Sequence, residues 1–257
     1  MKKWFVFLGV ILVCGVFRSQ KVLPLAALPL TESSEVYADD YLNTYLYEKQ
    51  NFSFTKYDVS GKVVGRQMFT VPFAVRSVTN PLKVVLFSQS AQEIRFLDAY
   101  LNEVQRLSVG RFGFISTVYT EDLQQVWLLD DSEKRLIQYN FREDRVINSF
   151  PFFIGYHDLR DFLVYEGKVY VLTEDFLRGY TFSAEKICEI QIDGATRLVR
   201  KGAAIFVVSD SGLFRLDSNN QQAATLVKKE EGKIVDKNSS AYFVLTEGKL
   251  YLYPLEN

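Results

Sequence analysis

The feature that most constrains the fold is an apolar quartet that recurs six times, at intervals of 36 to 43 residues. The copies are TYLY at 44–47, VVLF at 84–87, VWLL at 126–129, VYVL at 169–172, IFVV at 205–208 and YFVL at 242–245. A period of about 20 to 50 residues is typical of solenoids, propellers and other arrays of one structural unit. The sequence therefore predicts six similar units.

The quartets indicate strands that are covered on both faces. Successive side chains of a strand point to opposite faces, so four apolar residues in a row leave neither face for water, whereas a half-exposed strand alternates apolar with polar residues. A charged or glycine-containing turn and a second strand follow, as in RLIQYNF at 135–141, and a further candidate strand precedes, as in FISTVY at 114–119. Four short strands in each of six units predict an all-β fold, a six-bladed β-propeller with four-stranded antiparallel blades.

One hairpin carries a family resemblance. VWLLDDSEKRLIQYN at 126–140 resembles the YVTN and NHL repeats, whose hairpins read roughly VYVxDxxxxxIxxFD, and the resemblance covers residues 36 to 253. It implies a propeller but no particular task. No unit has the GH and WD pairs of WD40 repeats, and a β-sandwich or a β-helix is the alternative architecture. NNQQAATLVKKEE at 219–231 is the one stretch that could form a helix.

The two ends of the chain suggest how the ring closes. The sixth unit ends at KLYLYPLEN, residues 249–257, before a fourth strand, and an open sheet edge invites aggregation. VLPLAALPL at 22–30 contains Pro24 and Pro29, and proline is tolerated on edge strands. We therefore expect this N-terminal segment to pair with KLYLY and close the ring; a flexible leader is the alternative.

The first residues have the pattern of a secretory signal. Lys2 and Lys3 precede an apolar run at 4–16, and we expect cleavage after Ser19, which leaves 20–257 as a single propeller domain. The run is shorter than the roughly 20 residues that span a bilayer, so no transmembrane anchor is predicted. Lipidation at Cys14 is the alternative, although the residue before it is not small. The predicted location is periplasmic or outer-membrane-associated.

Charge and cysteine content exclude several classes. Removing residues 1–19 removes three of the 30 basic residues and none of the 31 acidic ones, for a net charge near −4. Nucleic-acid-binding domains usually carry a basic patch or stripe, so no nucleic acid is predicted as a partner. The exported chain keeps Cys188 alone, which excludes an internal disulfide, and its apolar neighbours predict a small buried hydrophobe.

The sequence offers little chemistry. His157 is the single histidine, which excludes a histidine-rich metal site, and no phosphate-binding or nucleophile motif is present. No catalytic residue, cofactor or metal is therefore predicted. Acidic residues do gather in the links between second and third strands: Glu48, Asp130, Asp131, Glu133, Glu174, Asp175, Asp210 and Glu247. Paired carboxylates could serve glycoside hydrolysis or sugar binding at the channel mouth, although such residues are also common in solvated turns.

The links between neighbouring blades are instead aromatic and partly basic. VGRFGF at 109–114 and SFPFFIGYH at 149–157 contain more aromatic residues than solvated loops require. Exposed aromatics with arginine are typical interface anchors, and the alternative is that they fold over the blade edges. The predicted binding surface consists of Arg111, Phe112, Phe152, Phe153, Tyr156 and His157.

A signal ending in Ser19-Gln20, the aromatic content, and phrases such as NPLKVVLF and LDAYLNEV resemble exported propellers of Bacteroidota. The chain also weakly resembles the plug subunit of the type IX secretion translocon, which implies gating of an outer-membrane channel by contact. The leading hypothesis is thus a non-catalytic envelope protein that binds another protein, and the alternative is a carbohydrate-active enzyme or lectin. The oligomeric state stays open.

Overall fold

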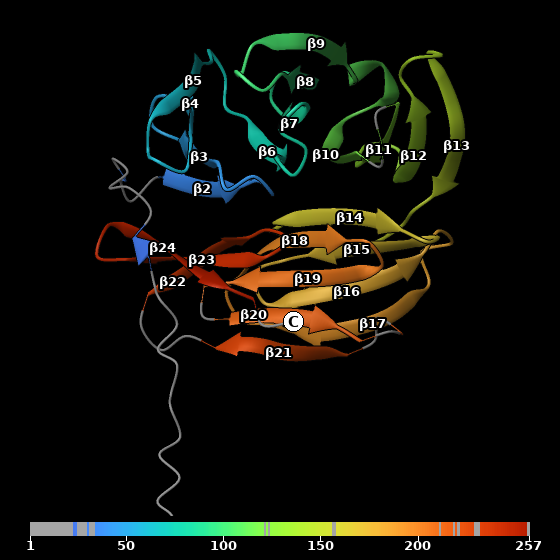
Figure 1. The fold of residues 1–257 in the computed structure, drawn as a ribbon. Coiled ribbons are helices and arrows are strands. Elements are labelled where there is room, and N and C mark those ends of the chain that lie inside the picture. The colour runs from blue at the N-terminus through green and yellow to red at the C-terminus, as the bar shows by residue number, and fades with distance from the viewer. Residues whose placement is uncertain are drawn as a thin grey trace, which may run out of the picture.

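The computed structural model describes residues 23–24, 30, 34–120, 122, 124–155, 158–210, 212–217, 219, 222–228 and 232–255. Within them the chain forms six four-stranded antiparallel sheets, the blades, arranged as a β-propeller (Figure 1). The prediction of an all-β, six-bladed propeller is confirmed. The predicted signal at 1–19, with Cys14, lies outside the described residues.

Blades 1 to 5 each take four consecutive strands from one sequence unit, in order from the axis outward, whereas blade 6 takes its outermost strand from the N-terminal segment. Blades 1 to 3 are β2 (Ser34–Ala38), β3 (Thr44–Glu48), β4 (Ser53–Tyr57) and β5 (Val63–Met68); β6 (Ala74–Ser77), β7 (Val84–Ser88), β8 (Glu93–Leu97) and β9 (Glu103–Ser108); and β10 (Ile115–Thr120), β11 (Gln125–Asp130), β12 (Arg135–Asn140) and β13 (Arg145–Pro151). Blades 4 to 6 are β14 (Asp161–Tyr165), β15 (Lys168–Leu172), β16 (Phe176–Thr181) and β17 (Lys186–Gln191); β18 (Ala195–Lys201), β19 (Ala204–Ser209), β20 (Gly212–Leu216) and β21 (Ala223–Lys228); and β22 (Lys233–Lys237), β23 (Ala241–Thr246), β24 (Lys249–Pro254) and β1 (Leu23–Pro24).

The quartets lie on the second strand of each blade and pack in both directions. In blade 3, Val126 and Leu128 contact blade 2, whereas Trp127 and Leu129 contact blade 4. The described residues form one hydrophobic cluster at each of the blade interfaces, including the interface between blades 6 and 1. The core is therefore a circle of interfaces around the axis.

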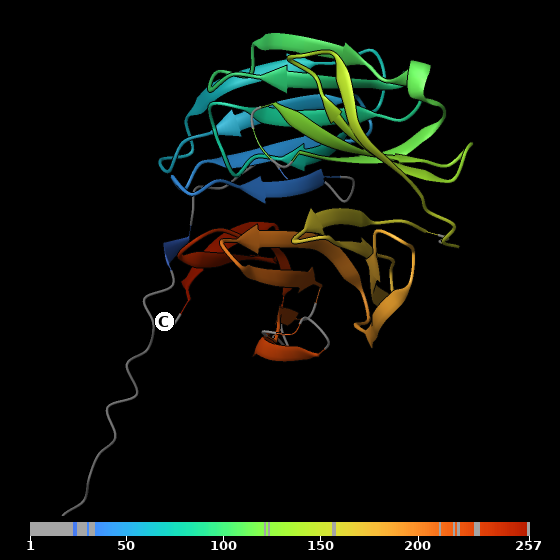
Figure 2. The same ribbon diagram turned by 90° about the vertical axis from the view of Figure 1, so that its right-hand side faces the viewer.

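The ring closes through the two ends of the chain. β1 pairs antiparallel with β24, with Leu23 opposite Leu252 and Pro24 opposite Tyr251. Figures 1 and 2 both show this short first strand beside the last strands of the chain. The predicted closure by the N-terminal segment is confirmed, and Pro24 lies on an outermost strand, where proline is tolerated.

The helix suggested for 219–231 is wrong. Residues Ala223–Lys228 form β21 and pair with β20. Hydrogen bonding to the edge of this sheet outweighs the local helix propensity. In the described part of the chain the one helical element is a single 3₁₀ turn, η1 (Gly110–Phe112). No helix among these residues is long and apolar enough to cross a membrane.

The hairpin between β23 and β24 allows a first stability prediction. Its two linking residues, Glu247 and Gly248, have φ values of 49° and 72°, which is the backbone of a type I′ turn. Asparagine tolerates the left-handed region better than glutamate, so Glu247→Asn should raise the free energy of unfolding by about 0.5–1 kcal/mol. Urea unfolding measures the change. Glu133→Asn, in a turn where that residue has negative φ, serves as the control, and an equal gain there would contradict the turn argument.

Candidate functional site

The first strands of the blades surround a central channel that two arginines divide. Arg76 on β6 and Arg197 on β18 line both a chamber of about 600 Å³ and a second chamber of about 380 Å³. The larger one opens on the front face, which we define by the links between blades, such as 109–114 and 152–160. The smaller one opens on the back face, which carries the links 39–43 and 98–102. The two arginines therefore form the partition between the chambers.

Both arginines are held by buried carboxylates. Arg76 reaches past blade 3 to pair with Asp161 on β14, and its Nε donates to the carbonyl oxygen of Val118 at 3.1 Å. Arg197 Nη1 donates to Asp236 Oδ2 on β22 at 2.6 Å, and its guanidinium lies 4.7 Å from the ring centroid of Tyr37. These contacts join blades that are not all neighbours in the ring.

The same carboxylates also accept backbone N–H groups from the following blade. Asp161 Oδ2 accepts from Leu198 N, and Asp236 Oδ2 accepts from Ala38 N, each at 2.7 Å. Burial raises the pKa of Asp236, and the nearby Arg197 opposes this shift. Burial alone would lower the pKa of Arg197, but Asp236, Tyr37 and Asp161 together outweigh it, so this pKa lies above its ordinary value. The partition is therefore a charged structural brace around the axis.

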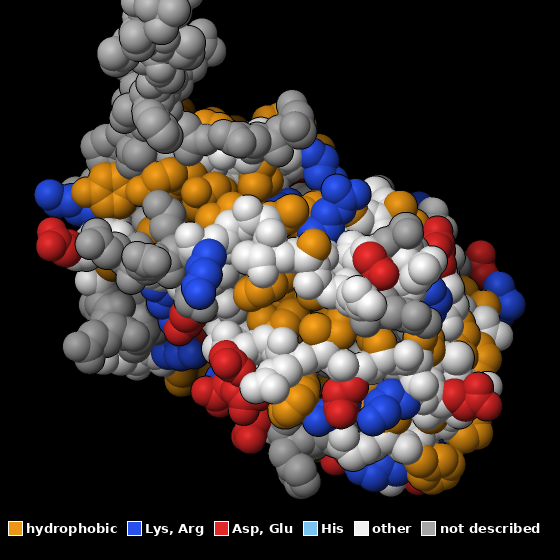
Figure 3. All heavy atoms as spheres, turned by 90° about the horizontal axis from the view of Figure 1, so that it is seen from below, with side chains coloured by type: hydrophobic (Ala, Val, Ile, Leu, Met, Phe, Trp, Pro, Cys, Tyr) orange, Lys and Arg blue, Asp and Glu red, His pale blue; other side chains and the backbone are white. Residues whose placement is uncertain are grey.

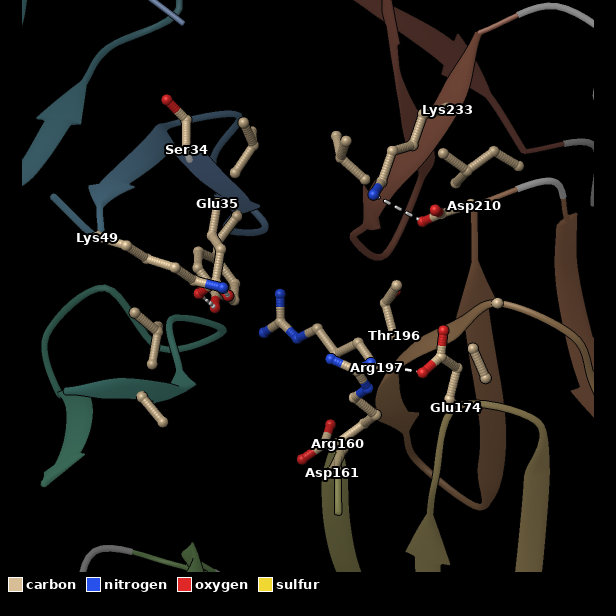
Figure 4. Close-up of a pocket in the computed structure, with 18 of the residues that line it drawn as sticks. Ser34, Glu35, Lys49, Arg160, Asp161, Glu174, Thr196, Arg197, Asp210 and Lys233 are labelled. Atoms are coloured by element: carbon tan, nitrogen blue, oxygen red, sulfur yellow. Dashed lines mark hydrogen bonds and ion pairs between the residues drawn. The ribbon is translucent and has the colours of Figure 1, made fainter. Parts of the chain in front are cut away.

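Each acidic side chain that lines the front chamber forms an ion pair with a lysine or an arginine. Glu35 pairs with Lys49 at 2.6 Å, Glu174 with Arg160 at 2.8 Å and Asp210 with Lys233 at 2.9 Å, while Asp161 pairs with Arg76. Figure 4 shows Glu35 and Lys49 on one wall, and the pairs of Glu174 and Asp210 on the opposite one. The charges of this chamber are thus balanced within the protein.

On the front face, a buried carboxylate positions the link between blades 2 and 3. Asp130 accepts from Ser132 and from Arg135, whose Nη2 also donates to the carbonyl oxygen of Phe112 at 2.9 Å. Burial alone would raise the pKa of Asp130, but these hydrogen bonds outweigh it, so the pKa is lowered. Gly113 passes directly over Asp130 with φ of 121°, where an added Cβ would overlap the carboxylate. The link is therefore fixed rather than loose.

This arrangement presents two phenylalanines on either side of one turn. Phe114 N donates to Ser132 Oγ at 3.0 Å and Asp131 N donates to the carbonyl oxygen of Phe114 at 2.8 Å, while Phe152 N donates to that of Lys134 at 2.7 Å. The turn 131–134 therefore lies between the two links. Phe114 is 48% exposed and Phe153, the residue after Phe152, is 74% exposed. We call Phe114 and Phe153 the phenylalanine surface.

The predicted site residues have different environments. Arg111 is exposed but engaged: its Nη2 donates to Tyr139 Oη at 2.7 Å, and it forms an ion pair with Asp144. Phe112 packs on Tyr139, with ring centroids 4.8 Å apart. Phe152 is buried between blades 3 and 4, edge-on to Tyr180. Phe153 projects into solvent, and Tyr156 and His157 lie outside the described residues.

Sequence reasoning missed several parts of the site. Phe114 was omitted from the predicted surface, although Gly113 before it was a signal that the chain turns there. The braces of Arg76 and Arg197 were also missed, although an arginine within the apolar stretches FAVRSV and TRLVRK marked both positions. Cys188 is free and buried, as predicted from its apolar neighbours, and burial raises the pKa of its thiol. Among the described residues, no group of three or more His, Cys, Asp or Glu side chains could hold a metal ion.

Comparisons with known proteins concern the fold alone. No protein-family model and no curated protein matches the sequence. Among solved structures, BamB from Moraxella catarrhalis is similar at 13% identity over 85% of this chain and 70% of that one, with a TM-score of 0.40. Kluyveromyces lactis Hsv2 is similar at 11% identity, over 88% and 76%, with a TM-score of 0.46, and a streptogramin B lyase at 10%, over 92% and 87%, with a TM-score of 0.51. The shared feature is the propeller.

Proposed function

We propose that this chain is an exported, non-catalytic propeller that binds another protein of the cell envelope, in secretion or surface assembly. The observation that carries the proposal is the phenylalanine surface. A phenyl ring has no polar atom to bond water, and two such rings beside one turn of the front face are more than a solvated loop needs. Aromatic side chains that stay exposed on a rigid scaffold are typical anchors of protein interfaces.

Other exposed apolar side chains lie on the back face and on the outermost strands. Tyr41, Val59, Leu82 and Tyr100 lie in turns of blades 1 and 2 on the back face. Val63, Met68, Val104, Val146 and Leu226 lie on the outermost strands of four blades, where single apolar residues are common on protein surfaces. Figure 3, which views the molecule from below Figure 1, shows hydrophobic side chains on this side with acidic and basic ones interspersed among them. The phenylalanine surface is therefore a better candidate for a specific contact than these scattered residues of the outermost strands.

The front chamber does not favour the alternative of a carbohydrate-active enzyme. Glycosidases need two carboxyl groups that are free to act on the substrate as acid, base or nucleophile. Here Glu35, Glu174 and Asp210 are each held by a lysine or arginine of the protein. Asp161 is held by Arg76 and a backbone N–H. A sugar would have to displace these pairs before a carboxylate could act.

Export is supported by the sequence. The charged residues at 2–3 followed by the apolar run at 4–16 have the pattern of a secretory signal, and the resemblance to exported Bacteroidota propellers points to the same compartment. N-terminal sequencing of the protein from a periplasmic fraction tests this part. A mature chain beginning at Gln20 is expected, whereas an intact Met1 in the cytoplasm would contradict it.

The interface itself can be tested with a double substitution. Phe114→Ser with Phe153→Ser should weaken binding of the envelope partner by roughly tenfold or more, because buried aromatic anchors dominate interface energies. The partner is recovered from membranes by crosslinking to the wild-type chain, identified, and titrated against the purified variants. Both side chains are exposed, so thermal unfolding should be nearly unchanged.

A matched control removes two exposed aromatic residues from the back face. Tyr41 and Tyr100 are 73% and 65% exposed, and each follows an aspartate that caps its turn. Tyr41→Ser with Tyr100→Ser should leave the affinity within about twofold of wild type. Loss of binding in this control with retention in the phenylalanine variant would show that the front face is the wrong one, and binding to a glycan array without a protein partner would favour the lectin alternative.

A further inference from the structure

The back chamber differs from the front chamber in charge. It is lined by four cationic side chains, Arg76, Lys83, Arg197 and Arg200, and by one carboxylate, Asp122. Arg76 and Arg197 are already neutralised by Asp161 and Asp236. For Lys83 and Arg200, no carboxylate of the described residues lies within 4.0 Å of the charged nitrogens. Two positive charges of this chamber therefore form no ion pair with a described residue.

The carboxylate of Asp122 serves its own turn. Its Oδ1 accepts from Gln124 N at 2.6 Å and from Gln125 N at 2.7 Å. Lys83 reaches only the backbone at this residue, donating from Nζ to the carbonyl oxygen of Asp122 at 3.2 Å. Asp122 thus helps to position Lys83 without forming an ion pair with it.

Both free cations are held in place by aromatic residues. Lys83 Nζ lies 4.5 Å from the ring centroid of Phe96 and 4.7 Å from that of Phe141. Arg200 lies 4.7 Å from the ring centroid of Tyr165, and its Nε donates to Tyr119 Oη at 3.2 Å. Cations that are packed in this way lose little conformational freedom when a ligand binds, which favours affinity.

Burial of Lys83 disfavours its charged form. Burial lowers the pKa of Lys83 to about 8, with Arg142 acting in the same direction and Asp122 against it. A bound anion would stabilise the charged form and raise this pKa again. An anionic ligand beside Lys83 would therefore favour the protonated, positively charged form of this side chain.

The remaining walls are partly polar, with Ser77, Thr79, Asn80, Tyr119 and Thr120, and partly apolar. Val85, Leu163, Leu198 and Val199 line the same 380 Å³ space, which is within the range of sites for small organic molecules. A bare inorganic ion would leave these side chains without contact. The chamber thus combines two fixed cations with a hydrophobic wall.

We propose that the back chamber binds a small organic anion, with its oxyanion group between Lys83 and Arg200 and its apolar part against Val85, Leu163 and Leu198. Guanidinium and ammonium groups bind phosphate and carboxylate oxygens through charge-assisted hydrogen bonds, so either oxyanion fits this chemistry. This site is separate from the phenylalanine surface, on the opposite face of the ring.

Calorimetric titration of the full chain with phenyl phosphate, benzoate and inorganic phosphate tests the proposal. Phenyl phosphate or benzoate should bind at least several-fold more tightly than inorganic phosphate, because of the apolar wall. Arg200→Gln and Lys83→Gln should each lower the affinity for the organic anion by about tenfold. The control Lys233→Gln removes a cation from the front chamber and should change the affinity less than twofold.

A second readout separates binding from folding. The NMR titration of the Lys83 side chain should show its pKa rising when phenyl phosphate or benzoate is present, and Arg200→Lys should retain part of the affinity. Failure of the wild-type chain to bind any of the three anions at millimolar concentration would overturn the proposal. So would an equal loss of affinity in Lys233→Gln.

Discussion

Replacing Trp127 by alanine is expected to lower the free energy of unfolding by about 3 to 5 kcal/mol. Trp127 is 3% exposed and fills the interface between blades 3 and 4. Its ring centroid lies 5.0 Å from that of Phe182 and 6.5 Å from that of Phe150. Alanine would remove these contacts and leave a cavity that rigid neighbouring sheets cannot fill. Urea unfolding followed by far-ultraviolet circular dichroism measures the loss.

The burial argument has a matched control in the same region. Phe153→Ala removes an aromatic side chain that is exposed, so it should change the free energy of unfolding by about 0.5 kcal/mol or less. A Trp127→Ala loss below about 1 kcal/mol would contradict the interface packing. Equal losses in both variants would show that Phe153 is also part of the core.

The fold was predictable because propeller packing leaves a local signature. A blade strand between two neighbours needs apolar residues at consecutive positions, and Val126 to Leu129 show this need directly in the sequence. Ring closure was predictable because the last unit lacked a fourth strand and the N-terminal segment at 22–30 preceded the first unit as an additional candidate strand. The wrong helix at 219–231 arose where β21 is largely exposed, so its residues carry little hydrophobic pattern and only pairing with β20 sets their conformation.

The site was less predictable because it depends on contacts between distant residues. Arg76 and Asp161 are 85 positions apart, and Arg197 and Asp236 are 39 apart, so no local pattern joins them. The aromatic links show a different limit. Composition identified the link 149–157, but one step along the backbone separates a buried Phe152 from an exposed Phe153, and only the packing against Tyr180 decides which is which.

Truncating Arg197 to alanine is the second change with a large expected effect. The side chains of Arg197 and Asp236 are 13% and 1% exposed, and Asp236 has no other cation bonded to it in the described structure. Removing one partner of a buried pair leaves an uncompensated charge and typically costs about 3–5 kcal/mol. We expect a loss of this size in urea unfolding at pH 7. Asp210→Ala, which breaks an exposed pair with Lys233, should cost about 1 kcal/mol or less.

The pH dependence of the Arg197→Ala variant identifies the cause of its loss. Burial raises the pKa of Asp236 in the folded chain, and without Arg197 only the hydrogen bonds from the backbone of Ala38 and Lys237 oppose the shift. Folding then favours the neutral carboxyl, so the deficit relative to wild type should shrink as the pH falls toward about 4, and should grow as the pH rises through the folded-state pKa. A deficit that is independent of pH would attribute the loss to packing alone.

Replacing both Arg197 and Asp236 separates the cost of an unpaired buried charge from the loss of the connection between blades. Arg197→Met with Asp236→Leu replaces the pair by apolar side chains of similar length and leaves neither partner of this pair as an unpaired buried charge, and such replacements are often neutral or stabilising. The Ala38 N–H loses its acceptor in this variant, which costs about 1–3 kcal/mol. We therefore expect the double variant to be more stable than Arg197→Ala at pH 7 but less stable than wild type. A double variant as unstable as Arg197→Ala would mean that the ion pair contributes a connection between blades 5, 6 and 1 that packing cannot replace.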